Sequence, residues 1–145
     1  MPSIRSQIAD ALLARIATLP AIKSSSFDVV RLQANDFQDW ELPAVQIIDL
    51  GEINTHETRR AKKGWQLVVE LILGPTGATV PTQKTLWDLM QDLEQAIWAE
   101  PNLNIPGVVH MVLTQTSTDL HLMTPYYLGR IELQVDYYQP LVGTC

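Results

Sequence analysis

Cysteine is nearly absent from this chain. The 145 residues include one cysteine, Cys145, which is the last residue, so no disulfide can form within the chain. A single unpaired thiol is typical of a reducing compartment. No run of about 18 apolar residues occurs, so no membrane-spanning helix is predicted. Arg5 and Asp10 interrupt the first apolar stretch, and we therefore expect neither a signal peptide nor a transit peptide.

Motifs that carry chemistry are also missing. The seven glycines form neither a Gly-x-Gly-x-x-Gly nor a Gly-x-x-x-x-Gly-Lys-Ser/Thr pattern, so no phosphate-binding loop is predicted. No Cys-x-x-Cys pair is present. His110, Asp119 and His121 offer at most a thin metal site, and we read them, like His56, as surface residues of loops and strands. Cys145 is unsuited to nucleophilic catalysis, because a terminal residue cannot hold a base in line. We therefore predict no enzymatic activity, no metal and no cofactor.

Basic residues are scarce in the second half of the chain. The net charge is −6, and residues 81–145 contain seven acidic residues against Lys84 and Arg130. An acidic domain does not bind nucleic acid through counterion release. Four of the ten basic residues are clustered, namely Arg59, Arg60, Lys62 and Lys63. The cluster is either a solvated loop tip or a group that docks onto an acidic partner.

Two helices are predicted from apolar residues that recur every third or fourth position. The first covers residues 3–19, with Ser3 as N-cap and an apolar stripe of Ile4, Ile8, Leu12 and Ile16. The second covers residues 82–99, with Thr82 as N-cap and a stripe of Leu86, Met90, Leu93 and Ile97. Its carboxylates, Asp88, Asp92 and Glu94, form either a solvated face or a surface for a basic partner.

Five strands are predicted, at residues 27–33, 44–50, 65–73, 108–117 and 128–138, whereas residues 23–26 and 118–125 are expected to form loops. The order of elements favours an α+β fold in one domain, residues 1–145. Its sheet would be mainly antiparallel or mixed, with four to five strands and two helices packed on one face. In the last strand Gly129, Ile131, Leu133, Val135 and Tyr137 alternate with Arg130, Glu132, Gln134 and Asp136. The charged set would meet water or a polar partner.

The segment between the second and third strands is too long for a tight turn. We read residues 52–64 as an extended hairpin arm that carries the basic cluster to a neighbouring subunit, because long loops are usually functional or disordered. The four tryptophans, Trp40, Trp65, Trp87 and Trp98, are mostly core candidates. Trp40 is the exception, since it lies in a polar segment where a tryptophan would anchor an interface.

The order of these segments resembles the tail-terminator family of tailed bacteriophages. The resemblance covers nearly the whole chain. It rests on the segments Ile4–Ile16, Leu42–Glu52, the arm ending in Arg59-Arg60, Trp65–Leu73, Leu93–Trp98, Pro101–Leu103 and Gly129–Tyr138. The extended segment 34–41 and the residues after Pro140 depart from the family pattern. The resemblance implies a homohexameric ring that caps the tail tube, ends its polymerisation and offers a surface to a head-side connector or neck protein.

The family resemblance also implies further properties. The protein would be a virion component assembled in the host cytoplasm, with no catalytic residue, and double-stranded DNA would pass through the ring without specific binding. Six copies would carry a formal charge of six times −6, or −36, so the channel wall would repel DNA. The face of Arg130, Glu132, Gln134 and Asp136 would line this channel or the seam between subunits. The alternatives are a related neck or tail-completion protein, a small-ligand regulatory module, and a metal or hydrolytic enzyme.

Overall fold

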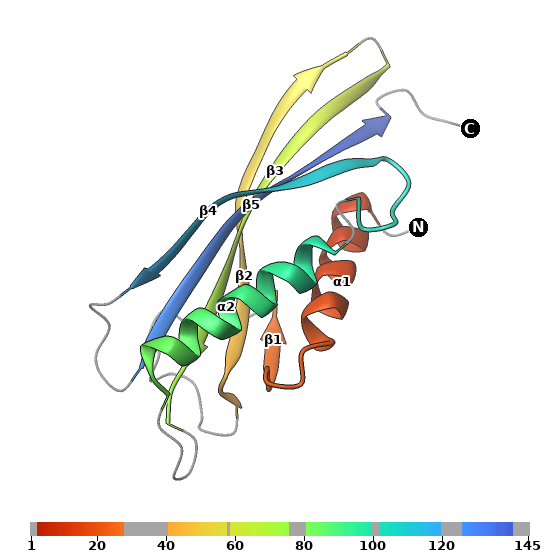
Figure 1. The fold of residues 1–145 in the computed structure, drawn as a ribbon. Helices are drawn as coiled ribbons and strands as arrows, with labels where there is room; N and C mark the ends of the chain where they lie inside the picture. The colour runs from red at the N-terminus through yellow and green to blue at the C-terminus, as the bar shows by residue number, and fades with distance from the viewer. Residues whose placement is uncertain are drawn as a thin grey trace.

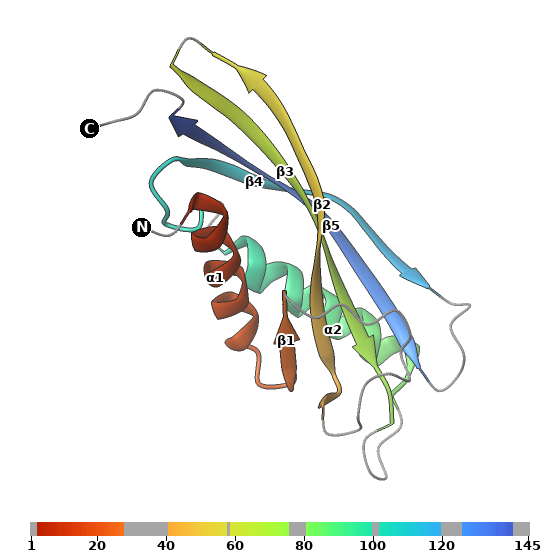
Figure 2. The same cartoon turned by 180° about the vertical axis from the view of Figure 1, so that it is seen from behind.

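The fold consists of one five-stranded sheet with two helices on one side (Figures 1 and 2). The computed structural model describes residues 3–27, 41–57, 59–75, 81–99, 102–119 and 126–140. The elements are α1 (Ile4–Ala17), β1 (Ser24–Ser26), β2 (Ala44–His56), β3 (Arg60–Leu73), α2 (Gln83–Trp98), β4 (Val108–Asp119) and β5 (Tyr127–Pro140). The strand order is β1-β2-β3-β5-β4, and every pair is antiparallel except β1 with β2. The predicted α+β class is confirmed.

Both helices begin at the residues that the sequence indicates. The Ser3 side chain accepts a hydrogen bond from the Ser6 amide, and the Thr82 side chain accepts one from the Thr85 amide, so each helix has a capped N-terminus. The predicted apolar stripes are confirmed, because Ile8, Leu12 and Ile16 of α1 and Leu86, Met90, Leu93 and Ile97 of α2 are all buried. No helix of the described segments is long and apolar enough to cross a membrane.

The core lies between the helices and the near face of the sheet. The predicted apolar face of β3 is confirmed, as is that of β5, and both sets belong to one buried cluster: Trp65, Leu67, Val69, Leu71, Leu73, Ile131, Leu133, Val135 and Tyr137. Gly129 lies on the same face and lets α2 approach closely. A Cβ atom at Gly129 would collide with the side chain of Met90. The charged alternate positions of β5 therefore face away from the helices.

The predicted strand boundaries need several corrections. Ser24–Ser26 was predicted to be a loop, but it forms β1 and pairs in parallel with Ala44–Gln46. Three serines give no apolar alternation, and backbone bonds hold this strand, among them one from the Lys23 amide to the Pro43 carbonyl at 2.8 Å. Thr118 and Asp119 belong to β4 rather than to a loop. Most of the strand predicted at 27–33 lies outside the described residues, as do most of the 34–41 segment and residues 120–125.

The side of the sheet opposite the helices has two different halves. Near the start of β2, Leu42, Ala44 and Ile72 form a second, small buried cluster with Tyr126 and Leu128 packed against it. Toward the other end of β2 the exposed residues are mainly polar. The half near the start of β2 is therefore buried in a small core of its own, whereas the other half is available for contacts with other molecules.

Candidate assembly surface

The arm, residues 52–57 and 59–64, is the continuation of the β2–β3 hairpin beyond the helices (Figure 1). The two strands stay paired out to His56 and Ala61, and the Glu57 amide donates to the Arg60 carbonyl at 2.8 Å. The register shifts between Asp49 and Gly51. Gly51 has a φ of 102°, which residues other than glycine rarely adopt. A bulge therefore bends the hairpin where the arm begins.

Glu52 fastens the root of the arm to two other elements. Its carboxylate forms an ion pair with Arg5 of α1 and accepts a 2.6 Å hydrogen bond from the hydroxyl of Tyr137 in β5. Lys63 of β3 approaches the same carboxylate at 3.9 Å. Because Glu52 and Tyr137 are largely buried, these bonds have little competition from water. The arm is thus held to the body at a defined angle.

A second carboxylate reinforces this root. Asp49 accepts a hydrogen bond from the indole nitrogen of Trp65 at 2.8 Å and one from the Gly51 amide at 2.7 Å. The guanidinium of Arg5 lies 3.7 Å from Asp49 and 5.1 Å from the centre of the Trp65 ring. Arg5 therefore contacts both carboxylates and an aromatic face, which fits the planar fork of its side chain. We call Arg5, Asp49, Glu52, Trp65 and Tyr137 the root network.

The root network shifts the titration of its members. Burial, followed by the hydrogen bond to the Glu52 carboxylate, raises the pKa of the Tyr137 hydroxyl well above its ordinary value. Partial burial alone would raise the pKa of Asp49, but the bonds from Trp65 and Gly51 and the charge of Arg5 outweigh it and lower that pKa. Both shifts favour the protonation states seen in the network at neutral pH, a neutral tyrosine and a charged carboxylate.

The basic cluster is divided among several environments. Arg60 donates to Glu57 at 2.7 Å, and its guanidinium lies 3.7 Å from the ring centre of Tyr138. Lys63 points to the root network, and Lys62 lines a depression on the far face. Arg59 is exposed and bonds to none of the described residues. Among the described residues, nothing therefore occupies the guanidinium of Arg59, which leaves it available to another molecule.

The predicted charged face of β5 lies on the side of the sheet without helices. Arg130 lies 3.4 Å from Glu70 of β3, and Gln134 donates to Asp136 at 2.8 Å. His110 of β4 lies 3.2 Å from Asp136. Asp136 is only 8% exposed, and this part of the face is a set of paired groups, within β5 and across strands, rather than a row of free charges. The side chain of Glu132 is half-buried, beside a depression.

Two shallow depressions adjoin this charged row. One has a volume of about 230 Å³ and is lined by Leu50, Gln66, Leu67, Thr114, Glu132, Leu133 and Gln134. The other has a volume of about 180 Å³ and is lined by Ile53, Thr55, Lys62, Gly64, Gln134 and Asp136. Leu50 and Ile53 are 52% and 60% exposed. The face thus mixes exposed apolar side chains with polar ones, a composition common at the contacts between proteins.

The candidate metal residues do not come together. His110 and Asp119 are nine residues apart in β4, which separates them by about 30 Å along the strand. In the described segments no group of three His, Cys, Asp or Glu side chains is arranged to hold a metal ion. His56 is exposed on the arm. His121, Cys145 and Trp40 lie outside the described residues.

The tryptophan prediction is right for one residue and wrong for two. Trp65 is buried in the core and in the root network. Trp87 and Trp98 were expected in the core but are 54% and 50% exposed. Both project beside the buried stripe of α2 rather than within it. The indole nitrogen of Trp98 donates to the Met111 carbonyl of β4 at 2.9 Å.

The fold resembles that of a protein from a virus-like particle. No protein-family model matches the sequence, and no curated protein matches it. A solved structure described as "Virion of native gene transfer agent (GTA) particle" contains a chain similar to this one, with a TM-score of 0.56 and 10% sequence identity. The match covers 94% of this chain and 96% of the other. The likeness therefore concerns the whole architecture of both chains.

Sequence reasoning missed the root network. Its Glu52–Tyr137 hydrogen bond joins residues that are 85 positions apart in the chain, so no local spacing indicates the contact. Several ionised groups of the described surface are paired with one another, as in Arg130–Glu70 and Arg60–Glu57. Its exposed groups include Arg59, Trp87, Trp98, Leu50 and Ile53. Such groups suit protein–protein contacts.

Proposed function

We propose that this chain is a structural virion protein, a tail terminator that forms a ring on the end of a phage-like tail tube. Residues 1–145 would form one terminator-like domain that ends tube polymerisation and presents a surface to the head-side connector. The observation that carries the proposal is the likeness, over nearly all of both chains, to a chain of a gene transfer agent virion. The sequence resemblance to the tail-terminator family supports the same role.

The geometry of the arm supports a ring. A projecting hairpin whose root is fixed by Arg5, Glu52 and Tyr137 presents its tip at a constant position. A tip that contacts a different surface on the next copy makes a heterologous interface, which closes into a ring when the rotation between copies allows it. We propose the homohexamer of the family, of about 98 kDa, six times the 16.3 kDa of one chain.

The charge suits a channel for DNA. Six copies carry a formal charge of −36, and like charge keeps DNA from adhering to the wall. The far face of β5, with Glu132 and Asp136, would line this channel or a subunit seam. Reversing both residues to lysine should hinder ring assembly or DNA passage. Asp10→Lys, on the exposed side of α1, is the control, and a double variant with normal infectivity would contradict this assignment.

Deletion of the gene in the strain that produces the particles tests the terminator role. A terminator limits polymerisation, so we expect overlong tail tubes without heads in electron micrographs of the deletion strain. Tails of normal length without heads would instead indicate a neck or tail-completion protein of the same architecture. Normal particles would refute a role in the virion. Native mass spectrometry of the purified chain measures ring formation separately.

A small-ligand module is the weaker alternative. Its binding site would be a cavity of about 300–1,000 Å³ that encloses most of the ligand. The two depressions of about 230 and 180 Å³ on the far face are smaller. The first is lined mostly by aliphatic and amide side chains with one carboxylate, Glu132, and the second includes Lys62 and Asp136. These dimensions favour a contact surface over a binding pocket.

A further inference from the structure

The exposed tryptophans of α2 lie on one side of the helix. Trp87 and Trp98 are 11 residues apart, which is roughly three turns plus 20°, so they are aligned about 16 Å apart along the axis. Gln91 and Glu94 fall between them on the same side. We call Trp87, Gln91, Glu94 and Trp98 the tryptophan face.

Contacts with β4 hold this face in place. The Trp98 indole donates to the Met111 carbonyl, and the Glu94 carboxylate accepts a 2.6 Å hydrogen bond from Thr116. β4 is the edge strand of the sheet, so the tryptophan face borders the free edge. A side chain fixed in position loses little rotamer freedom when a partner binds it. Two half-exposed and aligned tryptophans are therefore well suited to anchor an interface.

The tryptophan face is aromatic and carries one carboxylate, Glu94, on a helix that is acidic overall, and the chain itself carries a complementary cation. α2 contains Asp88, Asp92 and Glu94 but only one cation, Lys84. The basic cluster of the arm offers Arg59, which bonds to no described residue. Among the described residues, arginines already stack on aromatic rings, as Arg5 does on Trp65 and Arg60 on Tyr138. Arginine over a tryptophan ring is a favourable cation–π contact.

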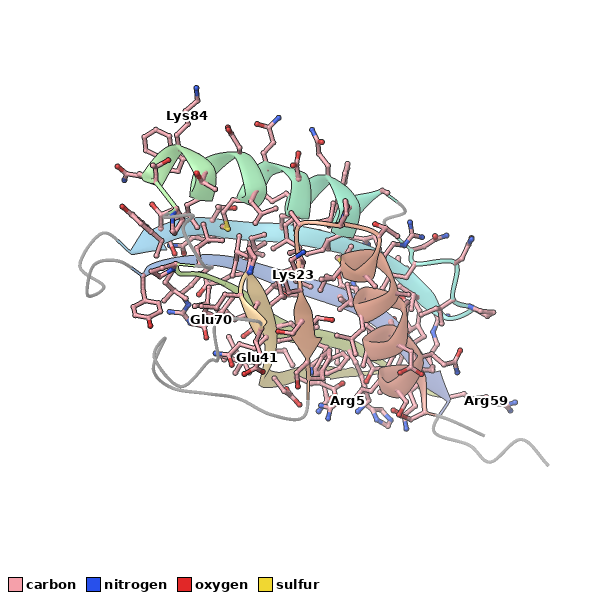
Figure 3. The ribbon with its side chains drawn as sticks, turned by 90° about the horizontal axis from the view of Figure 1, so that it is seen from below. Arg5, Lys23, Glu41, Arg59, Glu70 and Lys84 are labelled. Atoms are coloured by element: carbon pink, nitrogen blue, oxygen red, sulfur yellow. The ribbon has the colours of Figure 1, made fainter. Side chains whose placement is uncertain are left out.

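Arg59 and the tryptophan face do not contact each other within one copy of the chain. Figure 3 shows Arg59 and Lys84, the latter at the start of α2, at opposite ends of the molecule. The arm continues β2 and β3, whereas α2 contacts β5 and β4, which form the other half of the sheet. The arm tip and the tryptophan face therefore belong to different parts of the subunit, as a head-to-tail contact requires.

We propose that the tryptophan face receives the arm tip of a second copy of this chain, with the Arg59 guanidinium over one of the two tryptophan rings and beside Glu94. This inference rests on the proposed ring and names its subunit contact. Trp87 and Arg59 make no hydrogen bond within the described part of the chain, so each can be replaced without loss of the fold.

Disulfide trapping tests the contact. In a Cys145→Ser background, one preparation carries Arg59→Cys and another carries Gln91→Cys, and the two are mixed and oxidised. We expect a disulfide-linked dimer on a non-reducing gel, formed only in the mixture. The matched control pairs Gln91→Cys with Lys23→Cys, which is exposed but distant from the arm, and should give no such dimer. Absence of the Arg59–Gln91 cross-link in a preparation that forms rings would overturn the inference and leave the ring intact.

Assembly of point variants gives an independent readout. We expect Trp87→Ala and Arg59→Glu each to raise the concentration for half-assembly at least tenfold, measured by light scattering, while circular dichroism stays unchanged. Lys23→Glu, with the same charge change as Arg59→Glu, should assemble normally. If both test variants assemble like the unaltered chain, the contact is wrong. A chain that stays monomeric at every soluble concentration also refutes this contact, whereas the terminator role is decided by the tail lengths of the deletion strain.

Discussion

Replacing Tyr137 by phenylalanine is the sharpest test of the root network. The substitution removes one hydroxyl and leaves the ring, which is 2% exposed and packed in the core. The lost bond joins the hydroxyl to the Glu52 carboxylate at 2.6 Å, and bonds to charged groups contribute about 1.5–3 kcal/mol. Water cannot readily replace the hydroxyl at this buried position. We therefore expect the free energy of unfolding to fall by about 1.5–3 kcal/mol.

Urea denaturation at pH 7 measures this change. At the size of this chain, each kcal/mol corresponds to about 2–4 °C in Tm, so Tm should fall by roughly 3–12 °C. Tyr138→Phe is the matched control, because the neighbouring hydroxyl bonds to no described residue, and this change should stay within about 0.5 kcal/mol. If the two substitutions lower the free energy of unfolding equally, the Glu52–Tyr137 hydrogen bond does not contribute the proposed stability.

The raised pKa of Tyr137 adds a pH dependence with a defined sign. Above the ordinary tyrosine pKa of about 10, the unfolded chain loses this proton while the folded chain keeps it. The unfolded state then binds fewer protons, so stability falls as pH rises, by up to about 1.4 kcal/mol per pH unit for one group. The stability difference between the unaltered chain and Tyr137→Phe should therefore shrink above pH 10. A difference that stays constant to pH 11 would contradict the shift.

Two further substitutions test the packing and capping of α2. Gly129→Ala places a methyl group against Met90, so we expect a loss of about 1–3 kcal/mol in urea denaturation, and an unchanged stability would show that the helix moves away at no cost. Thr82→Ala removes the N-cap of α2 and should cost about 1 kcal/mol, whereas Thr82→Ser, which keeps the hydroxyl, should cost less. Equal losses for alanine and serine would contradict the capping role.

Strong local periodicity explains the successful parts of the sequence prediction. The stripes of α1 and α2 and the alternation of β5 are each repeated over ten or more residues, and each came out on the buried side. The prediction missed β1 because its three serines show no hydrophobic periodicity. Its pairing depends on the backbone of Ala44–Gln46, which is distant in the sequence. Whether such a segment forms an edge strand depends on the strand with which it pairs, and not on its own residue pattern.

The exposed tryptophans show a different limit. Composition alone places large aromatic residues in the core, and Trp65 follows that rule. For Trp87 and Trp98 the position around α2 matters more than the residue type, because the helix buries the stripe of Leu86, Leu93 and Ile97 and leaves its flank open. The sequence shows the spacing of the tryptophans along α2. It does not show how much of the circumference of the helix is buried against the sheet.

The amino-acid sequence by itself determined the class of the fold, the ends of both helices, the inward faces of β3 and β5, and the lack of a recognisable catalytic motif. These features follow from local rules of capping and periodicity. The tertiary structure alone decided that Arg5, Glu52 and Tyr137 meet, that His110 and Asp119 stay apart, and that two tryptophans remain uncovered. The physical reason is that contacts between distant segments depend on strand order and register. A hydrophobic pattern specifies which side of an element is buried but not which element covers it.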